Sequence, residues 1–137
     1  MALADFNVGQ SATSTRTLGE ADVMAFAAVT GDHNPVHVDA EAAAQSPFGE
    51  RIVHGMLTAS LLSALLASEL PGPGAIYLSQ TLEFLRPVKL GDTVTAHVSI
   101  TSIDAARRRL TLATTVRNAR GKNVLSGEAV IQLPADG

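Results

Sequence analysis

The sequence predicts an α+β fold in which an antiparallel sheet curls around one long buried helix, and three observations lead to this prediction. The apolar run from Leu57 to Leu70 has the composition of a helix that is enclosed rather than exposed. After the stop signal at residues 71–74, apolar and polar residues alternate with a period of two, which is typical of strands. The strands follow one another through short turns, whereas parallel pairing would need helical crossovers. An antiparallel sheet packed against a helix is therefore expected.

Length and composition narrow the possible functions. A chain of 137 residues is long enough for one domain, residues 1–137, with its own core. The absence of cysteine excludes disulfides, zinc–thiolate and iron–sulfur centres and a cysteine nucleophile. A net charge of −3, with Arg107–Arg109 as the one run of like charges, argues against nucleic-acid or membrane-surface binding. No signal peptide or membrane span is predicted, so we expect a cytoplasmic protein.

The first part of the chain predicts a strand and a helix. Ser11–Thr17 is rich in hydroxyl and β-branched residues and suits a short, partly exposed strand, or equally a loop. Thr17 and Glu20 have the spacing of a capping box, and helical spacing continues to Thr30, which predicts a helix of about three turns. Gly31 stands where a left-handed helix terminus is expected.

Two further helices are predicted before the strands. Asp39 reads as the N-cap of a short helix through Gln45, which Pro47 stops. The long helix is expected over about His54 to Glu69. It carries small residues at a spacing of four, which would let another backbone come close. These residues are Gly55, Ala59, Ser63 and Ala67.

Four strands are predicted after the long helix. They cover residues 76–85, 94–100, 110–116 and 124–133. Turn-forming residues divide them at 91–92, 104–106 and 118–123. Consecutive strands with short turns predict an antiparallel meander.

A polar stretch from Thr30 to His37 separates two helical patterns and contains the best candidates for chemistry. Asp32 and His37 lie five residues apart across Asn34-Pro35, a dipeptide that bends the chain and can bring both side chains to one point. A carboxylate and an imidazole together can take a proton from water and return one to carbon. The alternative is that Asp32 only caps the next turn and His37 is an exposed loop residue.

The histidines also suggest a metal site, which we do not expect. His33 and His37 are four residues apart, but metal ligands at that spacing need a helix, and Pro35 disfavours one there. His54 supplies no helical carboxylate–histidine motif. His97, alone on the polar side of a strand, is interpreted as a solvated residue.

Gly55 and Ser63 are the candidates on the long helix. In the first turn the Gly55 N–H has no intrahelical partner, and a helix N-terminus favours negative charge, so an oxyanion could bind there. Gly55 could equally serve only to start the helix in a crowded place. The Ser63 hydroxyl either bonds its own helix backbone or points toward the Asp32–His37 pair. Arg86, Lys89 and residues 107–109 are the basic groups best suited to phosphates of a bulky ligand.

Three motifs occur together in this sequence: Gly31-Asp32-His33-Asn34-Pro35-Val36-His37, Phe48-Gly49 and Ile52-Val53-His54-Gly55-Met56. In these motifs the chain resembles the MaoC-like (R)-specific enoyl-CoA hydratases of the hot-dog fold, in particular short bacterial members that supply polyhydroxyalkanoate synthesis. The resemblance continues through Pro71-Gly72, Ile76-Tyr77-Leu78, Phe84 with Arg86-Pro87-Val88, and Gly91-Asp92, and covers about residues 15 to 133.

The resemblance implies a catalytic assignment. Asp32 and His37 would activate water for addition to C3 of a trans-2-enoyl thioester and protonate C2, while the Gly55 N–H would polarise the thioester carbonyl. Asn34 would hold the water or the loop, and Ser63 would orient the pair. The residues that would limit the acyl tunnel are Leu66 with Val130 or Ile131.

The resemblance also implies a homodimer with the site at the subunit interface, an acyl-CoA substrate, and neither cofactor nor metal. A place in fatty acid metabolism follows, without fixing the acyl chain length. Two alternatives stay open. The first is a hot-dog thioesterase or hydroxyacyl-carrier-protein dehydratase, although a thioesterase usually brings a carboxylate from the long helix, which here offers only Glu69 at its far end. The second is a non-catalytic acyl-binding module.

Overall fold

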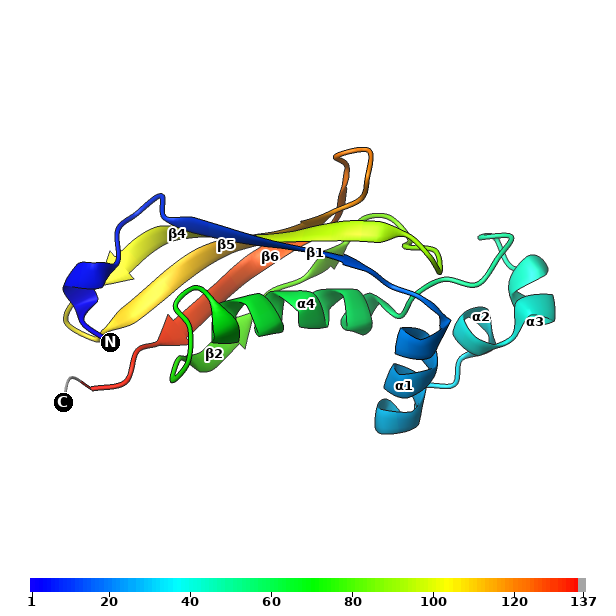
Figure 1. Ribbon diagram of the computed structural model, residues 1–137, viewed down its shortest axis with the longest axis horizontal. Coiled ribbons are helices and arrows are strands. Elements are labelled where there is room, and N and C mark those ends of the chain that lie inside the picture. Colours follow the sequence, from blue (N-terminus) through cyan, green and yellow to red (C-terminus); the bar gives the residue numbers. More distant parts are fainter. Residues whose placement is uncertain (136–137) are drawn as a thin grey trace.

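The computed structural model describes residues 1–135 and has an α+β architecture (Figure 1). The helices are the 3-10 turn η1 (Leu3–Asp5), α1 (Glu20–Thr30), α2 (Pro35–Val38), α3 (Ala40–Ala44) and α4 (Gly55–Ser68). The strands are β1 (Ser11–Thr17), β2 (Ile76–Gln80), β3 (Glu83–Phe84), β4 (Thr93–Asp104), β5 (Arg109–Arg117) and β6 (Asn123–Gln132). The predicted sheet wrapped around a long helix is confirmed, with α4 along one face of the sheet and α1 to α3 beyond one end.

The sheet is antiparallel throughout, in the order β1-β4-β5-β6-β2, with β3 also paired to β6. The predicted meander is correct for β4, β5 and β6. It is wrong for residues 76–85, which form two strands and pair with β6 at the other side of the sheet rather than with β4. The alternation of side chains cannot reveal this arrangement, because it reports which face a residue takes and not which strand lies beside it.

Thr81 produces the break between β2 and β3. Its N–H donates to the Glu128 carbonyl at 2.9 Å, and its hydroxyl accepts from the Glu128 N–H at 3.0 Å. The Thr81 backbone thereby lies directly over Gly127, where an added Cβ would be 1.8 Å from the Thr81 carbonyl oxygen. Only glycine permits this approach, and it directs β3 and Phe84 toward the start of α4.

The helix α4 packs one face on the sheet. Leu62, Leu65 and Leu66 are at most 2% exposed and belong to the main core cluster. The opposite face is open in the single chain, where Met56 is 57% exposed and Ser63 is also exposed. The expectation of a helix enclosed on all sides is therefore wrong for one chain, because the sheet covers one side only.

The caps of the first helix differ from the prediction at one end. The N-cap is Gly19, whose N–H donates to the Asp22 carboxylate at 2.9 Å, and this bond lowers the pKa of Asp22. The predicted capping box of Thr17 and Glu20 is wrong, since Thr17 ends β1. At the other end Gly31 is left-handed as predicted, with φ of +79°.

The segment between α1 and α4 contains more helix than predicted. Asp39 caps α3 as expected, accepting from two backbone N–H groups. However, Asn34-Pro35 does not simply bend the chain, because Pro35 starts the short helix α2 and the Asn34 side chain caps it. A proline removes a hydrogen bond only in a helix interior, whereas at the first position its missing N–H costs nothing.

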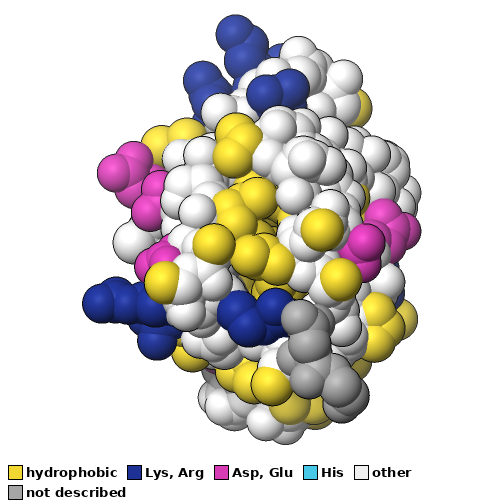
Figure 2. Space-filling model, turned by 90° about the vertical axis from the view of Figure 1, so that its left-hand side faces the viewer, with side chains coloured by type: hydrophobic (Ala, Val, Ile, Leu, Met, Phe, Trp, Pro, Cys, Tyr) yellow, Lys and Arg dark blue, Asp and Glu magenta, His cyan; other side chains and the backbone are white. Residues whose placement is uncertain are grey.

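The end of the molecule that carries both termini shows a group of hydrophobic side chains in the middle of its surface (Figure 2). Met1, Leu3 and Phe6 from the N-terminal segment are partly buried against the main core. Within residues 1–135, no helix has both the length and the apolar character needed to cross a membrane. This end lies away from α1, α2 and α3 (Figure 1).

Replacing Gly127 with alanine should lower the free energy of unfolding by about 3 kcal/mol, because the new methyl group would overlap the Thr81 backbone. Urea unfolding measures the loss. Gly19→Ala is the control, since no heavy atom lies within 4 Å of its Cβ position and only about 1 kcal/mol of capping is at stake. Equal losses in the two variants would contradict the close approach.

Candidate active site

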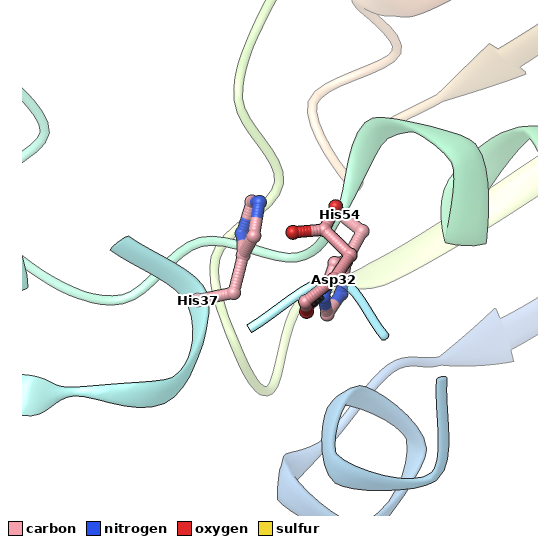
Figure 3. Close-up of side chains that lie close together, drawn as sticks. All are labelled: Asp32, His37 and His54. Carbon is pink, nitrogen blue, oxygen red and sulfur yellow. Dashed lines mark hydrogen bonds between the residues drawn. The ribbon is translucent and has the colours of Figure 1, made fainter. Parts of the chain in front are cut away.

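Three side chains from separate elements meet at the end of α4 (Figure 3). Asp32 comes from the loop after α1, His37 from α2, and His54 is the N-cap of α4. One potential ligand atom from each lies within 4.8 Å of the others. The predicted convergence of Asp32 and His37 is thus present in the structure, and His54 joins it.

His37 is buried and has one nitrogen committed to the backbone. Its side chain is 8% exposed, so the alternative of an exposed loop residue is wrong. The Nδ1 atom lies 2.8 Å from the Ile52 carbonyl oxygen, and because that oxygen can only accept, Nδ1 carries the proton in the neutral ring. The Nε2 atom is then an acceptor that can take a proton from water.

Asp32 is exposed and is held by short local contacts. Its carboxylate accepts from the Asn34 N–H at 3.2 Å, and its own N–H donates to the Thr30 hydroxyl at 3.1 Å. The carboxylate and the His37 ring lie close enough for one water molecule to contact both. The pair therefore has the geometry of a group that activates water.

Asn34 and Arg51 hold α2 in place. The Asn34 side-chain oxygen accepts from the Val36 N–H at 3.3 Å, so the structure places this residue as a helix cap. The Arg51 guanidinium donates to the His37 carbonyl at 2.6 Å and pairs with Glu20 of α1 at 2.5 Å. Sequence reasoning missed Arg51, because a single arginine in a loop carries no signal of spacing.

A pocket of about 350 Å³ opens beside His37 and the first residue of α4. It is mostly apolar, and Phe48, Phe84 and Val88 contribute to its walls together with Gly55. As the first residue of α4, Gly55 has an N–H without an intrahelical partner, at the positive end of the helix dipole. A Cβ on Gly55 would be 2.7 Å from the Phe84 ring, so both alternatives raised by the sequence, a crowded start and an anion site, fit this position.

The other predicted site residues lie in separate parts of the structure. Ser63 lies on the exposed face of α4 and lines a second hollow of about 540 Å³ with Phe26, Tyr77 and Gln80. Within the described residues its hydroxyl forms no hydrogen bond, unlike Ser60, which bonds its own helix backbone. The structure does not place Ser63 in the pocket that His37 and Gly55 line.

The residues predicted to limit the acyl tunnel are Leu66 on α4 and Val130 and Ile131 on β6, and the two β6 residues point to opposite faces of the sheet. Leu66 and Ile131 are both buried in the core between α4 and the sheet. Val130 is half-buried and, as the neighbour of Ile131 in a strand, points to the opposite face. Of the two alternatives given with Leu66, Ile131 is thus the one that shares its core.

Two of the basic residues predicted to bind phosphates, Arg86 and Lys89, also lie in different hollows. Arg86 lines the pocket beside His37 and donates to the Asn123 carbonyl at 2.7 Å. Lys89 pairs with Glu50 at 3.4 Å and faces a neighbouring polar hollow of about 320 Å³ with Arg120.

Asp32, His37 and His54 have the composition of a metal site, but the two rings do not fit one. They stack with centroids 4.0 Å apart and an interplanar angle of 29°. The stack aligns the faces of the two rings rather than their nitrogen edges, and Nε2 of His54 already donates to the Asp32 carbonyl at 3.0 Å. The arrangement suits a water molecule between Asp32 and His37 better.

The comparisons with known proteins agree with this fold. The profile of the MaoC like domain matches residues 5–121. An (R)-specific enoyl-CoA hydratase of Rhodospirillum rubrum is 46% identical over 133 residues, covering 97% of this chain and 92% of the relative. The same activity is named for a protein of Aeromonas caviae, 46% identical over 134 residues, covering 98% of this chain and all of the relative.

Two solved structures superpose on nearly the whole chain. The unliganded R-hydratase of Pseudomonas aeruginosa gives a TM-score of 0.92 at 49% identity and covers 98% of this chain and 86% of that one. The A. caviae (R)-hydratase gives a TM-score of 0.92 at 46% identity and covers 94% and 98%. These structural neighbours are hydratases of the hot-dog fold, in which an antiparallel sheet wraps a long helix, and the present chain has the same fold. The chain belongs to the MaoC-like family.

Proposed function

We propose that this protein catalyses the (R)-specific addition of water to trans-2-enoyl-CoA, yielding (R)-3-hydroxyacyl-CoA, as a hydro-lyase. The observation that carries the proposal is the meeting of the Asp32 carboxylate and the His37 ring beside a pocket walled by the first residue of α4. The full-length relatives named as (R)-specific enoyl-CoA hydratases support it.

In the proposed reaction, Asp32 and His37 bind the attacking water. The pair takes a proton from the water as its oxygen bonds to C3, the electrons of the C2–C3 double bond move toward C2 and the carbonyl oxygen, and the pair returns a proton to C2. Negative charge develops on the thioester oxygen, and the Gly55 N–H donates to that oxygen at the helix N-terminus. Asn34 supports the loop. If the Ser63 hydroxyl orients the Asp32–His37 pair, it must do so from the second hollow, outside the pocket that His37 lines.

Substrate binding follows from the same pocket. The apolar wall formed by Phe48, Phe84 and Val88 would take the start of the acyl chain, and Arg86 at the pocket wall is the basic group best placed for the CoA portion. Leu66 and Ile131 lie in the closed core outside this pocket, so a role in limiting chain length would require the core to open toward it. Lys89 would meet a more distant part of CoA from the neighbouring hollow.

The alternatives have less support. A thioesterase would need a carboxylate on α4, and residues 55–68 contain none, since Glu69 is the C-cap. A carrier-protein dehydratase uses the same chemistry on another thioester, and a non-catalytic module would leave the buried and oriented His37 without a task.

We also propose a homodimer formed through β2 and the open face of α4. The strand β2 is an edge of the sheet, where unpaired backbone groups invite a partner. Ile76 and Leu78 on β2 and Met56 on α4 are between 44% and 57% exposed, which is typical of an interaction surface. The hollow that contains Ser63 lies between these two elements.

The product connects the protein to fatty acid metabolism. The A. caviae (R)-hydratase is described as involved in polyhydroxyalkanoate biosynthesis. We propose that this protein supplies (R)-3-hydroxyacyl-CoA to synthesis of the same polymer. We place this activity in the cytoplasm, where acyl-CoA thioesters are formed and used.

Purified protein incubated with crotonyl-CoA should lose the enoyl absorbance without release of free thiol. Asp32→Asn and His37→Gln should each lower turnover at least about 100-fold, because each removes a group that moves a proton. Both variants should still unfold cooperatively, with a lower melting temperature for His37→Gln, because that ring is buried and bonded to the Ile52 carbonyl. Thiol release would support the thioesterase, no reaction would support the binding module, and near-normal rates in either variant would exclude the pair.

Gly55→Ala should reduce turnover by about tenfold or more, because the methyl group displaces Phe84 into the pocket and hinders the approach of the carbonyl. Crotonyl-CoA kinetics measure the effect. Ala67→Gly, at an exposed position three turns further along the same helix, is a control for altered helix stability alone. A turnover equal to that of the wild type would count against the oxyanion role of Gly55.

Light scattering on the purified protein should give the mass of two chains. Leu78→Arg should shift the mass toward one chain, since a charge would be buried at the proposed interface. Val29→Arg, at an 86% exposed position on α1, should leave the mass unchanged. A wild-type mass of one chain would overturn the dimer.

A further inference from the structure

His54 is a buried titratable group to which the proposed reaction assigns no step. Its side chain is 1% exposed, although the ring lies within a few ångströms of the exposed Asp32. Burying an imidazole is unfavourable unless the ring gains compensating contacts, and three contacts hold this ring. They are with Asp32, His37 and Phe26.

The first contact is a hydrogen bond to the loop that carries the carboxylate. The Nε2 atom of His54 lies 3.0 Å from the Asp32 carbonyl oxygen, so Nε2 carries the proton and donates it. The loop around Asp32 is otherwise held by short bonds among its own residues, such as that from the Asn34 N–H. The bond from His54 connects this exposed loop to the rigid start of α4.

The second contact is the stack on His37. The centroids are 4.0 Å apart and the planes differ by 29°, while Phe26 packs on His54 at 4.8 Å. The Nδ1–H bond to Ile52 fixes one edge of the His37 ring, and the stack limits rotation of its face. One side chain therefore sets the position of both proposed catalytic groups relative to the neighbouring Gly55.

We propose that His54 is a positioning residue of the hydration site: it holds the Asp32 main chain through its Nε2–H and holds the His37 ring by stacking. This inference rests on the proposed function, because it concerns how the pair is aligned with the substrate. His54 need not touch the substrate or transfer a proton. Small displacements of aligned groups can lower rates by a factor of about 100.

Two substitutions separate the two contacts. His54→Phe keeps a ring to stack on His37 and loses the N–H, whereas His54→Gln keeps an N–H donor and loses the ring. Each should lower kcat for crotonyl-CoA by about 10- to 100-fold and leave KM within about twofold, because alignment and not substrate binding is affected. Activity is expressed per folded protein, measured by the amplitude of thermal unfolding. His97→Gln, a half-buried histidine on β4, is the control that should keep kcat.

Either folded variant with a kcat within about twofold of the wild type would overturn the proposal. A raised KM with unchanged kcat would also overturn it, since that result indicates substrate binding instead. Should both variants fail to fold, the tautomers of the wild-type protein decide the matter. Nitrogen-15 NMR of histidine-labelled protein should show the His54 proton on Nε2 and the His37 proton on Nδ1.

A His54 proton on Nδ1 would remove the hydrogen bond to Asp32 and refute the inference. This spectroscopic result does not depend on turnover. If the wild-type protein shows the expected tautomers but does not hydrate crotonyl-CoA, the proposed function fails while the contacts of His54 stand.

Discussion

The packing of α4 on the sheet is the interaction on which the rest of the structure depends. Leu62, Leu65 and Leu66 fill the space between helix and strands, and burial of each such side chain contributes about 2 kcal/mol. This packing fixes the helix axis and with it the position of Gly55. The polar segment before the helix can then be short and irregular, because hydrogen bonds attach it to Ile52 and His54 at the helix start.

The polar site is held mainly by backbone carbonyl groups. The Ile52 carbonyl accepts from His37, the Asp32 carbonyl accepts from His54, and the His37 carbonyl accepts from Arg51. Carbonyl groups cannot change their protonation, so they define the tautomer of each ring without adding charge to the site. The groups that face the pocket side of the site are the Asp32 carboxylate and Nε2 of His37, while Nδ1 of His54 is buried and has no hydrogen-bond partner among the described residues.

Much of the architecture and of the candidate site could be predicted from the sequence. The alternation of apolar and polar residues with a period of two predicted β4, β5 and β6. The polar motif indicated that Asp32 and His37 meet, because both lie in one short segment. Pairing between distant strands could not be predicted, since the approach of Thr81 to Gly127 depends on packing. The contacts of Arg51 and His54 were equally hidden, because each joins residues at least 14 positions apart. The open face of α4 resembled a core face, since composition does not distinguish a buried apolar face from an exposed one.

The close approach of Thr81 to Gly127 couples the edge of the sheet to the wall of the pocket. The strand β6 carries β2, which is the sheet edge, and β3, which brings Phe84 to the pocket, and the Thr81 backbone joins the two. A shift of the edge strand would therefore be transmitted to the pocket wall within a few residues. A substitution at the sheet edge can thus change the shape of the pocket without replacing any residue that lines it.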